Sequence, residues 1–269
     1  IPTYSTPEQA VKTYMYMHQY SRNLEMLYQT PEELPLDSVP PKRPIEVIIK
    51  EAAKQKRDIL TETEAKQLLE NYRIPIVKTV IAKTEDEAVN AASSIGYPVV
   101  MKILSPQIVH KSDIEGVILD INSREELVDS YRKLMQRAKE KVPDAVIQGV
   151  TVQPMISRIG YEVILGAQTD SLFGPVVLFG MGGVGVEIFK DVTIGLPPLN
   201  QNLAKRMIEE TKVYNMLKGF RNMPPANLKL LEETIVRFSQ MLIDFPQIKE
   251  VDINPLFVNE NDVIALDAR

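Results

Sequence analysis

Three expected helix starts carry the same local pattern, in which a hydroxyl side chain is followed three residues later by a carboxylate. It occurs at Thr61 and Glu64, at Thr84 and Glu87, and at Ser123 and Glu126. In such a pair, each side chain can bond a backbone N–H that the first turn of a helix leaves unpaired. The pattern therefore predicts three helix starts. Apolar segments between them predict that helices and strands alternate along the chain.

The expected strands are rich in Val, Ile and Leu and lie at residues 77–82, 98–104, 116–121, 151–156, 161–169 and 175–180. Alternation in 116–121 predicts a drier face formed by Val117, Leu119 and Ile121. The run 175–179 is continuously apolar, which predicts a strand covered on both faces. Two further helices are expected at 200–218 and 227–244, and two closing strands at 248–258 and 263–268. These elements predict an α+β or mixed α/β protein.

The N-terminal segment differs in character from the rest. Thr6 and Pro7 suit the start of a helix over residues 7–28. Five prolines follow in residues 31–44, which predicts a stiff, extended linker and a domain boundary. Because the chain starts at Ile1, we expect it to be a piece of a longer polypeptide or a processed product.

Composition excludes several classes of function. The 269 residues include no cysteine, so disulfides, thiolate metal sites and cysteine nucleophiles are excluded. With 31 Lys and Arg against 36 Asp and Glu, the net charge is −5, and the basic footprint of a nucleic-acid binder is missing. No apolar run approaches the ~20 residues that span a bilayer. We expect a cytoplasmic protein that binds neither nucleic acid nor membrane.

Lys102 and His110 are candidates for phosphate chemistry. Lys102 interrupts an otherwise apolar strand, where a charge is unfavourable without a partner. It is either a lysine extending to solvent at a strand end or a cation held over a nucleotide phosphate. His110 lies in a polar loop, where it is either solvated or able to accept and return a phosphoryl group. His18, on the first helix, is interpreted as structural.

A glycine-rich segment follows the strand 175–180 and includes Gly182 and Gly183. Glycines let backbone N–H groups approach an anion closely. The segment matches neither the dinucleotide-binding nor the classical phosphate-loop pattern, because residues 186–189 look like a strand and no Lys-Ser/Thr ending follows. By itself, a plain glycine hairpin is the better interpretation.

Three oxygen-bearing side chains near the C-terminus form the strongest candidate site. Asp252 and Asn254 are two residues apart on one predicted strand, so they point the same way. A tight return could bring Asp267 beside them. Carboxylate and amide oxygens are suitable ligands for Mg²⁺, with phosphate and water completing the octahedron. The alternative is a structural polar cluster. Gln153 and Met155, with Glu162 on the next strand, could seat an adenine where the chain crosses between subdomains.

Taken together, these segments resemble a known family. They come in family order as residues 60–62, 97–102, 105–113, 153–155, 180–183, 196–200, 252–256 and 266–269. The chain resembles the ATP-grasp (beta) part of the NDP-forming acyl-CoA synthetases, the ADP-forming acetate–CoA ligase group related to succinyl-CoA synthetase. The resemblance covers roughly residues 45–269. It implies an N-terminal subdomain at 45–151 and a C-terminal subdomain at 152–269. Residues 1–30 resemble the tail of a flavodoxin-like CoA-ligase domain, followed by the linker 31–44.

The resemblance implies an acid–thiol ligase that interconverts acid, CoA and ATP with acyl-CoA, ADP and phosphate. In this family phosphate passes from an acyl phosphate to a histidine of the CoA-ligase part and then to ADP. His110 would be a second phosphate carrier, and Lys102 would hold nucleotide phosphates. Asn254 and Asp267, with Asp252 close by, would hold Mg²⁺, and Glu162 would line the adenosine site. The acid and CoA would bind in upstream CoA-binding and CoA-ligase domains or an alpha subunit, so the fragment alone would be inactive.

Two departures from the family pattern leave alternatives open. Glu115 stands where family members usually have glycine, close to His110, and residues 191–196 lack an arginine that many members have. Segments 196–200 and 218–221 are similar to fusions with an acetyltransferase domain, so a regulatory nucleotide- or ligand-sensing module is one alternative. A carboxylate–amine ligase would share Lys102 and the Mg²⁺ site but would leave His110 unexplained.

Overall fold

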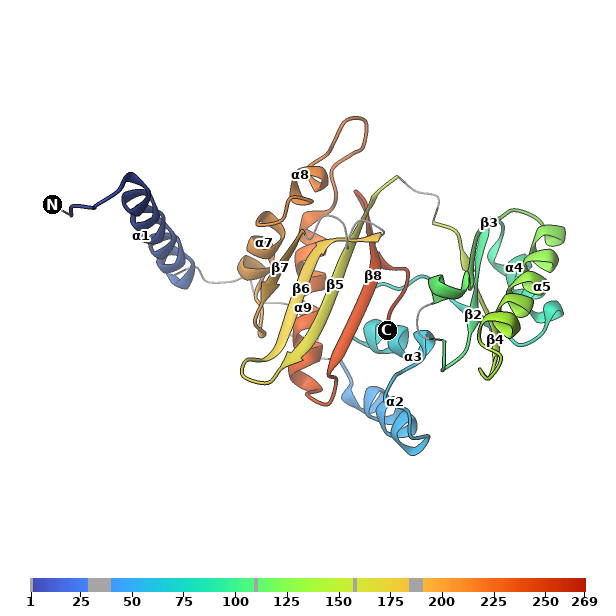
Figure 1. Ribbon diagram of the computed structural model, residues 1–269. Coiled ribbons are helices and arrows are strands. Elements are labelled where there is room, and N and C mark those ends of the chain that lie inside the picture. The colour runs from blue at the N-terminus through green and yellow to red at the C-terminus, as the bar shows by residue number, and fades with distance from the viewer. Residues whose placement is uncertain (1, 29–39, 109–110, 157–158, 184–190) are drawn as a thin grey trace.

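Two antiparallel sheets organise the protein. The computed structural model describes residues 2–28, 40–108, 111–156, 159–183 and 191–269 (Figure 1). One sheet has four strands in the order β1-β4-β2-β3, and the other has five strands in the order β7-β6-β5-β8-β9. The chain enters the first sheet, completes it, and then builds the second, so each sheet is made from a nearly continuous stretch of sequence.

The strands are β1 (Val80–Ala82), β2 (Val99–Leu104), β3 (Val117–Ile121), β4 (Gly149–Pro154), β5 (Tyr161–Asp170), β6 (Gly174–Met181), β7 (Val192–Gly195), β8 (Glu250–Val258) and β9 (Val263–Ala265). The helices are α1 (Pro7–Tyr28), α2 (Lys42–Lys54), α3 (Glu62–Asn71), α4 (Glu85–Ile95), the 3₁₀ helix η2 (Lys111–Ile114), α5 (Arg124–Lys141), α7 (Gln201–Glu209), α8 (Tyr214–Leu217) and α9 (Leu228–Asp244).

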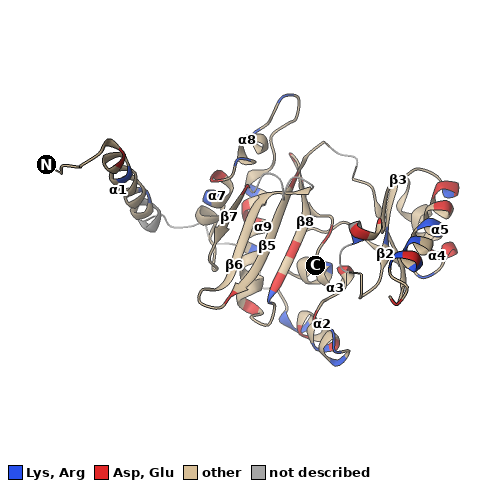
Figure 2. Ribbon diagram, in the orientation of Figure 1, with Lys and Arg blue, Asp and Glu red and all other residues tan. Residues whose placement is uncertain are grey.

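The four-stranded sheet is covered on one face by α4 and α5 (Figure 1). Met101 and Ile103 of β2 point into this core, where they lie with Leu127 of α5. Because successive side chains of a strand point to opposite faces, Lys102 points the other way, toward the second sheet. The outer surfaces of α4 and α5 carry many charged residues (Figure 2), which is typical of a solvated helix face.

The five-stranded sheet packs against α7 and α9, with Phe179 and Phe238 at the centre of its core. Helices α2 and α3 also contribute to this core through Ile45 and Leu69, although they precede the four-stranded sheet in sequence. The backbone explains the placement: Val77 N–H donates to Ala265 O over 3.0 Å, which ties the segment after α3 beside β9. Residues 45–77 therefore pack with the five-stranded sheet. The division of the chain at residue 151 stays a prediction.

The predicted helix starts are confirmed. Thr61 and Glu64 form the reciprocal capping pair at α3. At α4 and α5, the Thr84 and Ser123 side chains accept from backbone N–H groups three residues later. Thr6 Oγ1 likewise accepts from the N–H of residue 9 at α1. Each of these contacts is local, so the sequence pattern is sufficient to predict it.

The structure differs from the prediction in two segments, the linker at 31–44 and the helix at 200–218. Helix α2 begins at Lys42, inside the segment 31–44 assigned to a linker, and residues 29–39 lie outside the described part of the chain. Pro44 fits there because the N–H groups of a first helical turn have no partner within the helix. The single helix predicted at 200–218 is wrong: α7 ends at Glu209 and α8 starts at Tyr214. Buried Asp191 accepts from the N–H groups of Lys212 and Val213, both over 2.7 Å, and this fixes the break.

Two predictions about strand faces are also wrong. Leu119 was placed on the drier face of β3 but is 55% exposed. The register of β2 against β3 shifts between Val99 and Met101, and Asp120 has a positive φ, so alternation is interrupted. In β6, Val177 and Phe179 are fully buried, but the opposite face is only partly covered, with Leu178 paired to exposed Ile194. The strand is covered fully on one face only.

Helix α1 lies apart from both sheets (Figure 1). Its described side chains are almost all solvent-exposed, including Tyr14, Tyr16 and Tyr20 at 65–72%. Within the part of the chain that the structure describes, no helix has the length and hydropathy needed to cross a membrane.

Candidate functional site

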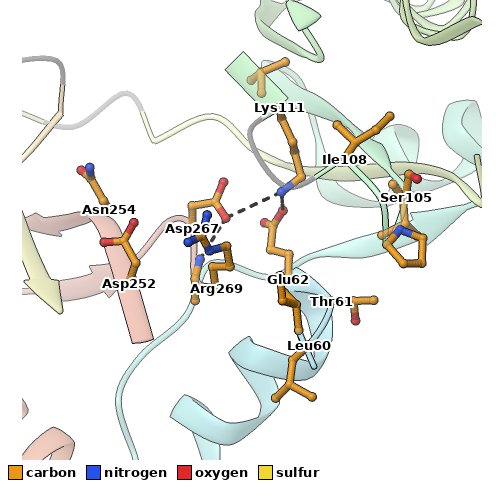
Figure 3. A pocket seen from close by; sticks show the side chains of 15 residues that line it. Leu60, Thr61, Glu62, Ser105, Ile108, Lys111, Asp252, Asn254, Asp267 and Arg269 are labelled. Carbon is orange, nitrogen blue, oxygen red and sulfur yellow. Dashed lines mark hydrogen bonds and ion pairs between the residues drawn. The ribbon is translucent and has the colours of Figure 1, made fainter. Parts of the chain in front are cut away.

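A polar cavity of about 230 Å³ lies between the two layers (Figure 3). One wall comes from the start of α3 and the loop before it. A second comes from the end of β2 with η2, and the third from β8 and the C-terminal residues. The side chains that carry its charge are Glu62, Lys111, Asp252, Asp267 and Arg269. The cavity thus gathers residues from three distant parts of the sequence.

Lys102 is buried, at 5% exposure, and contacts two residues that line this cavity, Glu62 and Asp267. Its Nζ donates to Asp267 Oδ2 over 2.8 Å, to the Leu266 carbonyl over 3.1 Å and to Glu62 Oε1 over 3.2 Å. Burial lowers the pKa of Lys102, but the charges of Asp267 and Glu62 outweigh it and raise the pKa above its usual value. Lys102 is therefore a fixed buried cation and not a lysine extending to solvent at a strand end.

Glu62 is the buried carboxylate that the sequence reading missed as a site residue. Lys66 Nζ lies 2.8 Å from Glu62 Oε1, and Lys111 Nζ lies 3.0 Å from Glu62 Oε2. With Lys102, three ammonium groups from α3, β2 and η2 meet at one carboxylate. The sequence contains an indication of this role. Glu62 and Lys66 are four residues apart, so they lie on the same face of α3, and Ala65 beside Lys66 is buried as well.

The pKa values of this cluster follow from its charges. Burial raises the pKa of Glu62, but attraction by Lys102, Lys66 and Lys111 lowers it to about 2 overall. Burial lowers the pKa of Lys66, partly offset by the charge of Glu62. A Glu62 pKa far below neutrality means that this carboxylate is ionised at physiological pH and holds the lysines as a true counter-ion.

The three candidate metal ligands come together in the cavity. Residues 266–269 run along β8, where Asp252 and Arg269 exchange two backbone hydrogen bonds of 2.9 Å. This return places Asp267 near Asp252 and Asn254, and all three line the cavity. Asn254 Oδ1 accepts from the Gly183 N–H over 3.0 Å, which orients the amide.

The donor set at this place suits a hard cation. Among the described residues, no three His, Cys, Asp or Glu side chains gather closely enough to hold a metal by themselves. An ion here would need the amide oxygen of Asn254 with Asp252 and Asp267, completed by phosphate or water. Mg²⁺ that binds together with a phosphorylated substrate typically takes few ligands from the protein and the others from phosphate and water. The residues present therefore fit a Mg²⁺ ion.

Gly182 and Gly183 follow β6 at a close approach to β5. Gly182 N–H donates to the Glu162 carbonyl over 3.0 Å, and an added Cβ at Gly182 would collide with the Val163 backbone. Gly183 has φ +65°, with the Glu162 side chain against it. The backbone geometry thus requires glycine here. The predicted strand at 186–189 lies outside the described residues.

The residues predicted to seat an adenine do not line this cavity. Gln153 on β4 is buried, and its Oε1 accepts from Lys66 Nζ over 3.2 Å. Met155 lies just after β4, where its N–H donates to the Pro98 carbonyl over 3.0 Å. Glu162 is exposed on β5. The structure therefore gives Gln153 a partner in the lysine cluster, and an adenosine role for the three stays a prediction.

His110 lies outside the described residues, and its predicted role stays a prediction. Glu115, the departure from the family pattern, is 60% exposed in its side chain. It pairs with Lys141 over 2.9 Å and Arg137 over 3.3 Å, both on α5. The hydrogen bond from Lys141 lowers the pKa of Glu115. Its negative charge is thus partnered by α5.

Comparison with known proteins gives a consistent result. Residues 51–269 match the ATP-grasp domain family. Over 219 residues the chain is 45% identical to the beta subunit of ADP-forming acetate–CoA ligase I of Pyrococcus furiosus, covering 81% of this chain and 94% of that subunit. It is 35% identical over 269 residues to ADP-forming acetate–CoA ligase I of Archaeoglobus fulgidus, covering 100% of this chain and 38% of that protein.

Solved structures of one further relative are similar in fold. Acetyl-coenzyme A synthetase 1 of Candidatus Korarchaeum cryptofilum, in complex with coenzyme A and Ca-AMPCP, has a TM-score of 0.80 and 39% identity. The match covers 83% of this chain and 97% of that one. Another structure of that synthetase contains coenzyme A and Mg-AMPPCP, with its phosphohistidine segment pointing towards the nucleotide-binding site. Its TM-score is 0.73 at 36% identity, and the match covers 84% and 98% of the two chains. Because the family match and the beta-subunit match both span most of the sequence, the chain belongs to the ATP-grasp domains of the ADP-forming acetate–CoA ligase family, as a homologue of their beta subunits.

Proposed function

We propose that this chain is the nucleotide-binding part of an ADP-forming acyl-CoA synthetase. It would pass phosphate between a phosphohistidine and ADP, as acyl-CoA, ADP and phosphate interconvert with acid, CoA and ATP. One observation carries the proposal: Lys102 and Asp267, a cation for phosphate and an oxygen ligand for a metal, lie 2.8 Å apart beside a cavity between the sheets. Family membership supports the same assignment.

Within this proposal each side chain has a separate task. Lys102 holds nucleotide phosphates, and Asp252, Asn254 and Asp267 hold Mg²⁺. When bound, the metal neutralises phosphate charge and orients the phosphate oxygens. Asn254 is held for this role by the Gly183 N–H. Gly182 keeps the backbone close to β5.

Two further assignments belong to the proposal. Gln153, Met155 and Glu162 would border the adenosine. His110 would carry the phosphoryl group between the nucleotide and the CoA-ligase part. The pairing of Glu115 with α5 supports this relay, because a partnered carboxylate opposes an approaching phosphate less than a free one.

Helix α1 supports a partner on the N-terminal side. Its tyrosines and methionines, among them Tyr16 and Met17, are large apolar side chains that remain exposed in the described structure. The Archaeoglobus fulgidus relative matches all 269 residues within a longer protein, whereas the Pyrococcus furiosus subunit matches 219. We therefore assign residues 1–30 to a CoA-ligase domain and 31–44 to a linker, with an alpha subunit or fused domains binding acid and CoA.

Calorimetry of MgADP binding tests the proposal. Asp267→Asn keeps the size of the side chain but weakens a metal ligand, and Lys102→Met keeps the stem but removes the charge. We expect each to weaken MgADP binding roughly 10–100-fold, the scale seen when groups at metal sites are lost. Asp129→Asn, an exposed position on α5, is the matched control and should bind normally. Wild-type affinity in both site variants would contradict the assignment.

A further inference from the structure

We propose that Lys111 is a second phosphate-binding lysine of the nucleotide site, and that Glu62 is the positioning carboxylate that holds Lys102 and Lys111 side by side. The proposal deepens the proposed function and rests on it. Neither residue is a candidate on sequence grounds, because Glu62 reads as part of a helix start and Lys111 as part of a polar loop.

Glu62 is placed to order both lysines. Its side chain is 2% exposed, and its two oxygens face different cations: Oε1 lies 3.2 Å from Lys102 Nζ, and Oε2 lies 3.0 Å from Lys111 Nζ. The same two lysines also face the two oxygens of Asp267, at 2.8 Å and 4.0 Å. Lys102 and Lys111 thus both lie between the carboxylates of Glu62 and Asp267, and Figure 3 shows Lys111 beside these two side chains in the cavity.

Lys66 holds the Glu62 carboxylate from the buried interior, with its Nζ 2.8 Å from Glu62 Oε1. It is 1% exposed, and besides Glu62 it bonds Thr79 Oγ1 over 3.0 Å and Gln153 Oε1 over 3.2 Å. Lys102 also has three acceptors, but one of them is Asp267, which a metal ion would draw away. Lys66 bonds no residue that the proposal assigns to the metal, so its three donors stay occupied. We therefore assign it to the support of Glu62 and not to the phosphate.

Lys111 is presented by a constrained backbone. Gly116 N–H donates to the Lys111 carbonyl over 2.7 Å, and Gly116 O accepts from Ile103 N–H over 2.8 Å, which ties η2 to β2. A Cβ at Gly116 would lie 2.8 Å from Ile103 Cγ2 and 3.0 Å from the Lys111 carbonyl oxygen, so a larger residue would crowd this turn. The side chain of Lys111 is 15% exposed and reaches into the cavity shared with Asn254.

The charge balance favours an anion. Lys66, Lys102 and Lys111 outnumber Glu62 and Asp267, the carboxylates with which they form ion pairs. The cavity also contains Arg269, together with Asp252, which the proposed function assigns to the metal. If Asp267 turns to a metal ion, Lys102 and Lys111 keep only Glu62 as counter-ion. The diphosphate of ADP carries more negative charge than one divalent ion neutralises, so two adjacent lysines would meet the remainder. Glu62 itself is no phosphate ligand, because its charge repels phosphate.

The first test compares Lys111→Met with Lys133→Met, an exposed position on α5, by MgADP calorimetry. Loss of one charge-assisted phosphate contact should weaken binding about 10–100-fold, while the control should bind as wild type. Normal binding by Lys111→Met, with weak binding by Lys102→Met, would overturn this inference and leave the proposed function intact. Normal binding by both would remove the proposed function as well.

The second test uses the sign of the effect of Glu62→Gln. If Glu62 only adds negative charge, removing it should tighten MgADP binding, because the repulsion of phosphate falls. If it positions the lysines, binding should weaken about tenfold, and the loss should nearly vanish in a Lys102→Met, Lys111→Met background, because its effect passes through those residues. The double variant Glu62→Gln, Lys66→Met keeps the cluster's net charge and should also weaken binding. Tighter or unchanged binding in both Glu62 variants, or an undiminished loss in the lysine-free background, would overturn the positioning role.

Discussion

Replacement of Glu62 by glutamine should lower the free energy of unfolding by about 3 kcal/mol at neutral pH. The pKa of Glu62 falls from an ordinary 4.5 to about 2, because the three surrounding lysines outweigh the effect of burial. At roughly 1.4 kcal/mol per pKa unit, the difference between these values corresponds to about 3 kcal/mol. Domains of this size have total stabilities of about 5–15 kcal/mol, so the variant should remain folded.

The predicted loss depends on pH in a defined direction. Because the folded-state pKa lies below the unfolded-state value, the stability from Glu62 is complete above pH 4.5 and is lost as pH falls toward 2. Glutamine does not ionise and lacks this contribution at every pH. The difference between wild type and variant should therefore be largest at neutral pH and should shrink in acid.

Urea unfolding without nucleotide, at several pH values between neutral and about 3, measures this difference. At neutral pH the melting temperature should also drop by about 6–12 °C. Glu70→Gln is the matched control, since Glu70 lies on the same helix but is exposed. A Glu62→Gln effect that stays constant down to about pH 3 would show that packing, and not charge, accounts for the role of Glu62.

Two further predictions concern the glycine-rich turn and the loop histidine. Gly182→Ala should lower the melting temperature, because its Cβ would collide with the Val163 backbone; thermal unfolding checks this, and an unchanged midpoint would contradict the close approach. In the protein that joins this chain to its CoA-ligase part, His110→Ala should keep MgADP affinity but lose acid-labile labelling from γ-labelled ATP, because a carrier affects rate and not ground-state binding. Labelling that persists in the variant would rule out His110 as carrier.

The sequence predicts best what depends on neighbours in the chain. The cap at Thr61 involves residues three positions apart, and the same-side placement of Asp252 and Asn254 follows from strand geometry. The break between α7 and α8 could not be predicted in this way, because its cause is Asp191, about twenty residues away in sequence. Leu119 was misplaced for a similar reason, since the shift in register against β2 is a property of the pair of strands.

The candidate site shows the same limit more sharply. Lys102 and Asp267 were each identified, but their direct contact joins residues 165 positions apart and was not predicted. Glu62 stands between Thr61 and Glu64, the pair that marks a helix start, and as an acidic residue of a first helical turn it gave no sign of its role among three lysines. The partners of the Glu62 side chain depend on where β2 and η2 lie, because these elements carry Lys102 and Lys111, and a local pattern does not contain this information.

The contact between Lys102 and Asp267 also constrains how ligands enter the site. Asp267 Oδ2 accepts from Lys102 while its Oδ1 accepts from the Ala268 N–H over 2.9 Å, so both oxygens are engaged. A metal ion at Asp267 would compete with the Lys102 ammonium for the same carboxylate and would be repelled by it. A phosphate beside Lys102 removes that repulsion by giving the ammonium another partner. If the roles proposed here hold, metal and nucleotide therefore favour each other's binding, and Glu62 is the carboxylate that keeps Lys102 in place during the exchange.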